Sequence, residues 1–243
     1  MQNNNLEEKI EKFKELIKFS NNIVFFGGAG VSTESGIPDF RSKDGLYNQK
    51  YDYPPEQILS HSFFMRNTEE FYKFYKDKMN SLKYEPNITH KKLAELENNG
   101  KLTGVVTQNI DGLHQKAGSK KVYELHGSVL RNYCMKCHKF FDADFVFKSN
   151  GVPTCECGGI VKPDVVLYEE GLDDNTVNGA IRTIMNADML IVAGTSLTVQ
   201  PASGLIHFYK GNKLVLINRD PTPYDSYADL VINDSLGKVF GEI

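Results

Sequence analysis

The 243-residue sequence contains no apolar run that approaches the roughly 18 residues needed to cross a membrane. Its first eight residues are polar and acidic, without the apolar stretch typical of an export signal. The net charge is only −3, with a pI near 6.1, so the chain as a whole has no electrostatic attraction for nucleic acid or anionic lipid. We therefore expect a cytoplasmic protein without a nucleic-acid or membrane partner.

Neither of the two common phosphate-binding fingerprints, G-x-G-x-x-G and G-x-x-x-x-G-K-[ST], is present. Instead, Gly28-Ala29-Gly30 directly follows the apolar run Ile23–Phe26, and Asp39-Phe40-Arg41 comes after a helix-breaking Gly36-Ile37-Pro38. A buried strand that ends in glycines exposes backbone N–H groups, and a helix starting there would add partial positive charge. The stretch therefore predicts a phosphate site, and the alternative is a turn that needs glycine for steric reasons.

Helical and strand patterns alternate along the chain, which predicts an α/β fold. Aromatic residues at near-helical spacing between positions 57 and 82 predict helices with an aromatic core. Positions 42–55 are polar and turn-rich, which suits a loop over a ligand or an ordinary surface loop. The expected helices cover residues 6–17, 89–96 and 173–186, and the expected strands cover residues 23–26, 102–107, 122–125, 189–193 and 214–217.

Polar residues follow four of the predicted strands. Gln108-Asn109-Ile110-Asp111 follows residues 102–107, Gly194-Thr195-Ser196 follows residues 189–193, and Asn218 follows residues 214–217. Ligands of open parallel sheets bind at the carboxyl ends of the strands, so we expect these groups to gather at one edge. His126 also follows a strand, where it could act as a general base or have a structural role only.

The four cysteines form two close pairs, Cys134 with Cys137 and Cys155 with Cys157, separated by seventeen residues. In a chain without an export signal, this spacing predicts a four-thiolate structural zinc site rather than disulfides. Because the second pair is C-x-C, His138 remains an alternative ligand. The C-x-x-C-H pattern at residues 134–138 also occurs at c-type haem attachment sites, but that chemistry goes with export.

Together these segments resemble the sirtuins, NAD-dependent protein lysine deacylases, and most of all the compact bacterial members. The matching segments occur in the family's order: Gly28 to Ser32, Asp39 to Arg41, Thr107 to Asp111, Leu125 to Gly127, the four cysteines, Gly194 to Ser196, and the strand that ends at Asn218. The resemblance implies a Rossmann-like parallel-sheet domain made of residues 1–41, 85–130 and 165–243. A smaller inserted domain would consist of a cofactor loop and helical module at 42–84 and a zinc ribbon at 131–164, in a monomer.

The resemblance also implies the residues that bind NAD and substrate. Ala29, Thr33 and Arg41 would contact the phosphates and neighbouring ribose, with Phe40 shielding the reacting carbon. The remaining implied contacts are Gln108 and His126 to the nicotinamide ribose, Ile110 and Asp111 to the carboxamide, Thr195, Ser196 and Asn218 to the adenosine half, Leu236 near the adenine, and Val166 to the acyl-lysine.

The activity implied is transfer of an acetyl group from lysine to ADP-ribose, giving nicotinamide, O-acetyl-ADP-ribose and free lysine, with NAD consumed as co-substrate and zinc holding the fold. His126 would deprotonate a ribose hydroxyl. Two alternatives remain: ADP-ribosyl transfer to a protein or to free nucleophiles from the same NAD site, and a non-catalytic NAD-sensing or interaction module.

Two positions bear on the substrate. Tyr168-Glu169-Glu170 stands where an aromatic residue, a glycine and a glutamate are frequent in the family, so the peptide groove is expected to differ here. Members that remove succinyl or malonyl groups use a tyrosine and, three residues on, an arginine. Here Tyr72 is followed by Tyr75, and burying a second carboxylate without a cation would be unfavourable. We therefore predict that the substrate carries a neutral acyl group, acetyl first.

Overall fold

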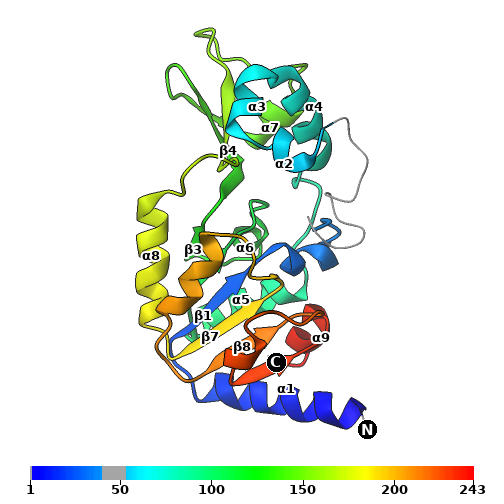
Figure 1. The fold of residues 1–243 in the computed structure, drawn as a ribbon, viewed down its shortest axis with the longest axis vertical. Coiled ribbons are helices and arrows are strands. Elements are labelled where there is room, and N and C mark those ends of the chain that lie inside the picture. The colour runs from blue at the N-terminus through cyan, green and yellow to red at the C-terminus, as the bar shows by residue number, and fades with distance from the viewer. Residues whose placement is uncertain (1, 40–52) are drawn as a thin grey trace.

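The core of the protein is a six-stranded parallel sheet with the strand order β3-β2-β1-β7-β8-β9 (Figure 1). The computed structural model describes residues 2–39 and 53–243. Every residue of β1 and β7 is buried, as expected for apolar parallel strands covered on both faces. The strands are β1 (Ile23–Gly27), β2 (Leu102–Thr107), β3 (Val122–Glu124), β7 (Met189–Ala193), β8 (Leu214–Ile217) and β9 (Leu230–Ile232).

Side chains alternate between the two faces of this sheet, and helices cover both. On one face Phe25 packs edge-on against Phe240 and lies in one cluster with Phe13. On the other face Phe26 belongs to a cluster with Ile184. The first face is covered by α1 (Gln2–Lys18), α5 (Ile88–Asn98) and α9 (Leu236–Gly241), and the second by α8 (Asp174–Met185) and the 3-10 helix η4 (Ala202–Phe208).

The strand order has a functional consequence. Counted along the chain within this sheet, it reads 3-2-1-4-5-6, the doubly wound arrangement of nucleotide-binding folds. The winding direction reverses between β1 and β7, which pair in parallel from Ile23 to Gly27. Ligands of such sheets bind outside the carboxyl ends of the strands at this reversal. A ligand site is therefore expected at the loops after β1 and β7.

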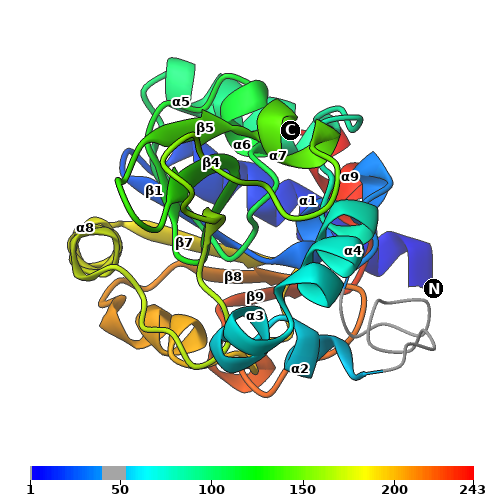
Figure 2. The same cartoon turned by 90° about the horizontal axis from the view of Figure 1, so that it is seen from above.

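A smaller unit lies at one end of the molecule, and both chain termini lie at the other (Figure 1); Figure 2 views the molecule from the end that carries this unit. Its three-stranded antiparallel sheet has the order β5-β4-β6. Buried aromatic side chains from its helices form a separate core. Its elements are β4 (Gly127–Cys134), β5 (Phe140–Asp142), β6 (Val161–Val165), α2 (Pro55–Ile58), α3 (His61–Arg66), α4 (Thr68–Lys78) and α7 (Ala143–Lys148).

The predicted α/β class, the parallel sheet and the aromatic core are confirmed. One local prediction is wrong. No α-helix begins at the glycine-rich loop, where two short 3-10 turns (Ala29–Val31 and Thr33–Ser35) stand instead. The short strand β9, which was not among the expected strands, pairs with β8 at the edge of the sheet. The predicted domain boundaries at 130/131 and 164/165 fall inside β4 and β6, and the division remains a prediction.

None of the helices in the described part of the chain combines the length and the apolar character needed to span a membrane.

Candidate functional site

The loops after β1 and β7 touch each other through their backbones. Gly30 N–H donates to the carbonyl of Gly194 over 2.8 Å, and Gly28 N–H donates to Ala193 over 3.3 Å. A Cβ atom on Gly30 would lie 2.7 Å from the Gly194 Cα, and Gly194 itself has a φ of +61°. These positions need glycine because the two backbones approach too closely for a side chain. The contact holds both loops at the carboxyl edge of the sheet.

Backbone groups rather than a helix dipole are available to an anion at this edge. The amide of Ala29 lies at the start of the first 3-10 turn and has no acceptor within residues 2–39 and 53–243. Thr33 starts the second turn, and its hydroxyl donates to the Gly30 carbonyl over 3.0 Å. Such short turns contribute loop N–H groups without the macrodipole of a longer helix.

A buried polar network joins the loop after β1 to the loop after β2. The hydroxyl of Ser32 donates to Asp111 Oδ2 over 2.7 Å, and the Asn109 amide donates to Ser32 over 3.1 Å. The second oxygen of Asp111 accepts from the Leu113 N–H at 2.9 Å. Burial raises the pKa of Asp111, although the Leu113 and Ser32 bonds oppose that rise. The network fixes Asp111 in place between the two loops.

His126 lies next to this network with a defined tautomer. Its Nδ1 is 3.0 Å from the carbonyl oxygen of Gln108. Since a carbonyl only accepts hydrogen bonds, Nδ1 carries the proton in the neutral ring and Nε2 keeps a free lone pair. Burial lowers the pKa of His126, and the Gln108 bond only partly offsets this. The histidine is therefore neutral at pH 7, which is the state that a general base requires.

Two buried side-chain amide nitrogens at the same edge have no hydrogen-bond acceptor in the part of the chain that the structure describes. Within the described residues, Gln108 Nε2 and Asn218 Nδ2 make no hydrogen bond. The other end of the Asn218 side chain is fixed, because its Oδ1 accepts from Thr195 N–H over 3.0 Å. Unpaired buried donors are unfavourable and rare in folded proteins, so a polar ligand at this edge would satisfy them.

The two remaining residues expected on the adenosine side differ in exposure. The hydroxyl of Ser196 is exposed and lies 2.8 Å from that of Thr198. Leu236 begins α9, and its side chain is only 6% exposed within the same cluster as Phe25 and Phe240. Little of the Leu236 side chain therefore faces outward.

The strand that begins beside His126 leads into the smaller unit. The carbonyl of His126 accepts from the N–H of Val166 over 3.0 Å, and Gly127 pairs with Val165. Gly127 has a φ of +73°, and a Cβ there would collide with the carbonyl oxygen of Asp164. The residue after the candidate base must therefore be glycine for two separate reasons. Val166, the expected acyl-lysine contact, lies directly beside His126.

The four cysteine sulfur atoms converge in the smaller unit. All four lie within 4.8 Å of one another, with 3.4 Å between Cys134 and Cys157 and 3.7 Å between Cys137 and Cys155. Tetrahedral zinc with Zn–S bonds of about 2.3 Å separates its sulfur ligands by about 3.8 Å. His138 is exposed and is not part of the group, so it is not needed as a ligand. The cysteines are positioned to bind a zinc ion, and the C-x-C pair contributes both of its sulfurs.

Residues 28–201 match the model of the Sir2 family. The chain belongs to the Sir2 family. It is 64% identical over 242 residues to an NAD-dependent protein deacetylase of Clostridium perfringens, covering 98% of this chain and 99% of the relative. It is also 61% identical over 237 residues to an enzyme of the same name from Clostridium tetani, covering 96% of each.

Solved Sir2 structures share this fold. A Sir2 variant with a deacetylated p53 peptide and 3'-O-acetyl-ADP-ribose superposes with a TM-score of 0.88 at 38% identity, covering 96% of both chains. A Sir2 complex with p53 peptide and NAD+ gives a TM-score of 0.85 at 39% identity, covering 96% of this chain and 95% of the other. The Sir2 fold therefore extends over nearly the whole sequence.

Not all expected site residues of this Sir2 chain can be located. Phe40 and Arg41, together with positions 42–52 of the expected cofactor loop, lie outside the described residues. Neither Ser32 nor Asn109 was among the expected site residues, although Ser32 binds Asp111 and Asn109 binds Ser32. Both are polar residues within the glycine loop and the segment after β2, which is the signal that could have identified them.

Proposed function

We propose that this Sir2 chain is an NAD-dependent protein lysine deacetylase with His126 as its general base. The observation that carries the proposal is the neutral His126 ring, with Nδ1 held by the Gln108 carbonyl and Nε2 left free. NAD supplies the ADP-ribose that accepts the acetyl group, nicotinamide is the leaving group, and one water is consumed when the lysine amine is released. His126 Nε2 takes the proton of a ribose hydroxyl, which is the step that needs a base near neutral pH.

The other residues of the edge bind and orient NAD. Asp111, held by Ser32 and the Leu113 N–H, accepts from the nicotinamide carboxamide, and Ile110 beside it keeps water from the reacting carbon. The unpaired amides of Gln108 and Asn218 donate to the ligand. The proposed NAD contacts are Ala29, Thr33, Phe40 and Arg41 on the first loop, Gln108, Ile110, Asp111 and His126 on the second, and Thr195, Ser196, Asn218 and Leu236 on the adenosine side.

The acyl-lysine peptide adds as a strand beside residues 164–166, with Val166 touching the acyl-lysine. Main-chain pairing of this kind gives affinity with little dependence on sequence. It places the acyl group near His126, because the Val166 N–H is bonded to the His126 carbonyl.

The acyl group is neutral, and the helical module supports this. The Tyr72 hydroxyl donates to the Val161 carbonyl, and Tyr75 is fully buried between Phe71 and Phe147, with ring centroids 5.4 and 5.6 Å away. Tyr75 therefore supplies no cation for an acidic acyl group. An acetyl-lysine peptide should be deacylated at least tenfold faster than its succinyl-lysine counterpart, because the succinyl carboxylate would be a buried charge without a partner. Equal rates would contradict this assignment.

Mass spectrometry of an acetyl-lysine peptide incubated with and without NAD tests the proposal. Wild type should release the acetyl group only with NAD and yield nicotinamide and O-acetyl-ADP-ribose. His126→Ala should lose this activity, whereas His207→Ala, which removes an exposed histidine, should retain it. If the peptide stays acetylated while protein mass rises in ADP-ribose steps, ADP-ribosyl transfer is the activity instead. If NAD is not cleaved at all, a binding module remains.

A further inference from the structure

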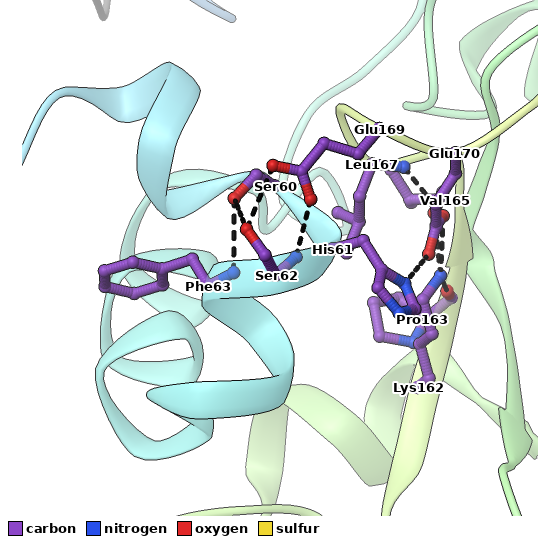
Figure 3. Close-up of polar contacts among 10 residues, drawn as sticks. All are labelled: Ser60, His61, Ser62, Phe63, Lys162, Pro163, Val165, Leu167, Glu169 and Glu170. Carbon is purple, nitrogen blue, oxygen red and sulfur yellow. Dashed lines mark hydrogen bonds and ion pairs between the residues drawn. The ribbon is translucent and has the colours of Figure 1, made fainter.

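The turn that follows β6 is fastened to the first residues of α3 (Figure 3). The N–H of Tyr168 donates to the Leu59 carbonyl, and the N–H of His61 donates to the Tyr168 carbonyl, each over 2.9 Å. Residues 166–170 thus connect the proposed peptide-binding strand to the helical module. The backbone pairing involves Tyr168 alone, so the side chains on either side decide how the turn is held.

Glu169 is the unusual residue of this turn, because its φ is +76°. A residue with a Cβ occupies this left-handed region at a cost of about 1 kcal/mol relative to glycine. Its carboxylate is bound at both oxygens by one residue: Oε2 accepts from the Ser62 N–H over 2.8 Å and Oε1 from the Ser62 hydroxyl over 2.9 Å. These two bonds hold Glu169 in a conformation that it would otherwise leave.

Glu170 fastens the same turn on its other side (Figure 3). Its Oε1 lies 2.8 Å from His61 Nδ1, and its Oε2 accepts from the Leu167 N–H over 2.9 Å and from Lys162 Nζ over 3.1 Å. Partial burial would raise the pKa of Glu170, but these donors outweigh it and the pKa is lowered. Glu170 is therefore an ionised anchor to both β6 and α3, whereas within the described residues the Glu169 carboxylate bonds to α3 alone.

The backbone of Glu169 is what the turn offers to a partner. Within residues 2–39 and 53–243, its N–H and C=O have no hydrogen-bond partner, and neither has the carbonyl of Val166. The N–H of Val166, Leu167 and Tyr168 are all bound internally. An added peptide strand needs such free donors and acceptors. The φ of Glu169 sets the direction in which its own free groups point.

We propose that the Glu169 carboxylate is a positioning residue for the acyl-lysine peptide. By bonding to Ser62 it fixes the left-handed turn and so presents the free N–H and C=O of Glu169 to the peptide backbone. This inference rests on the proposed function, since it takes the peptide that lies beside residues 164–166 to continue as far as Glu169. It assigns Glu169 a role in peptide affinity and none in NAD binding or chemistry.

Isothermal titration calorimetry of the zinc-loaded protein with an acetyl-lysine peptide, and separately with NAD, tests this role. Glu169→Ala removes both bonds and leaves the strain, so the peptide Kd should rise about tenfold while the NAD Kd stays within about twofold. Glu169→Gly, which takes a positive φ freely, should recover part of the loss. Glu95→Ala, which removes an exposed carboxylate on α5, should change neither Kd.

Ser62→Ala identifies the partner of the carboxylate. It deletes one of the two bonds, so it should raise the peptide Kd about threefold, and it should add nothing to Glu169→Ala in the double variant. An unchanged peptide Kd in Glu169→Ala, or equal weakening of peptide and NAD, would overturn the proposal. Deacetylation by wild type is measured separately. If peptide binding depends on Glu169 but no deacetylation occurs, the proposed function is contradicted and the positioning role remains.

Discussion

Mild acid should destabilise this protein through two buried histidines, His90 and His114. Their ring centroids are 4.8 Å apart, and within the described chain both nitrogens of His114 and Nε2 of His90 have no hydrogen-bond partner. Burial lowers the pKa of His90 to about 4. Burial, with a smaller contribution from His90, lowers that of His114 well below its ordinary value. A proton on either ring would be a buried charge without a counter-ion.

The sign and size of the effect follow from proton uptake by the unfolded chain. There, both histidines titrate near pH 6.5, whereas in the folded chain burial lowers the pKa of His90 to about 4 and that of His114 well below its ordinary value. The unfolded state therefore binds more protons as pH falls, and the free energy of unfolding decreases by about 1.4 kcal/mol per histidine per pH unit below 6.5. At pH 5 this is about 2 kcal/mol for His90, and His114 contributes in the same direction, against a typical total of about 5–15 kcal/mol. His126 acts in the same direction, and Asp111, whose pKa is raised, opposes it.

Urea unfolding followed by circular dichroism between pH 7.5 and 5 measures the slope. His114→Leu removes one titrating group, so its free energy of unfolding should fall less steeply than that of wild type, by about 1.4 kcal/mol per pH unit. His207 lies at the surface, so the free energy of unfolding of His207→Asn should change with pH as steeply as that of wild type. Any loss of zinc in acid is common to all three proteins and cancels in the comparison. If the free energy of unfolding of His114→Leu falls with pH as steeply as that of wild type, the reasoning is refuted.

Three further predictions concern the glycine, the metal and the adenosine side. Gly127→Ala should lower the free energy of unfolding, measured with urea, by about 3 kcal/mol. Gly151 also has a positive φ of +67° but has open space around it, so Gly151→Ala should lower the free energy of unfolding by only about 1 kcal/mol. Equal losses in the two variants would exclude the collision with Asp164. In differential scanning calorimetry, zinc chelation should lower the Tm by several degrees, and Cys134→Ser should lower it to a similar extent. His138→Ala should leave the Tm unchanged. Asn218→Ala should raise the KM for NAD about tenfold in steady-state assays and leave the peptide KM unaltered.

The sequence predicts well those parts of the fold that depend on local pattern. The apolar runs of β1 and β7 are fully buried strands, as their composition requires. The cysteine spacing predicts a site whose four sulfur atoms do converge. In both cases a few neighbouring residues carry all the information, so no knowledge of distant contacts is needed.

Features that depend on contacts between distant segments could not be predicted. The helix expected after Gly28 is absent because the loop is pulled onto Gly194, and nothing in residues 28–35 reveals that contact. The role of Ser32 depends on Asp111, 79 residues away. Likewise, the resemblance indicated that Glu169 departs from a common glycine, but only the position of Ser62 explains how a glutamate is held there.

The continuity of β4 limits how such a protein can evolve. This strand of eight residues begins directly after His126 and ends at Cys134. At one end it needs a glycine, because a Cβ there would collide with the Asp164 carbonyl of β6, and at the other end it carries a cysteine positioned to bind the metal. An insertion or deletion within β4 would therefore displace the glycine and the thiolate relative to each other, so the spacing between positions 127 and 134 is fixed. The ribbon and the edge that carries His126 are tied to one strand length, although they belong to different parts of the fold.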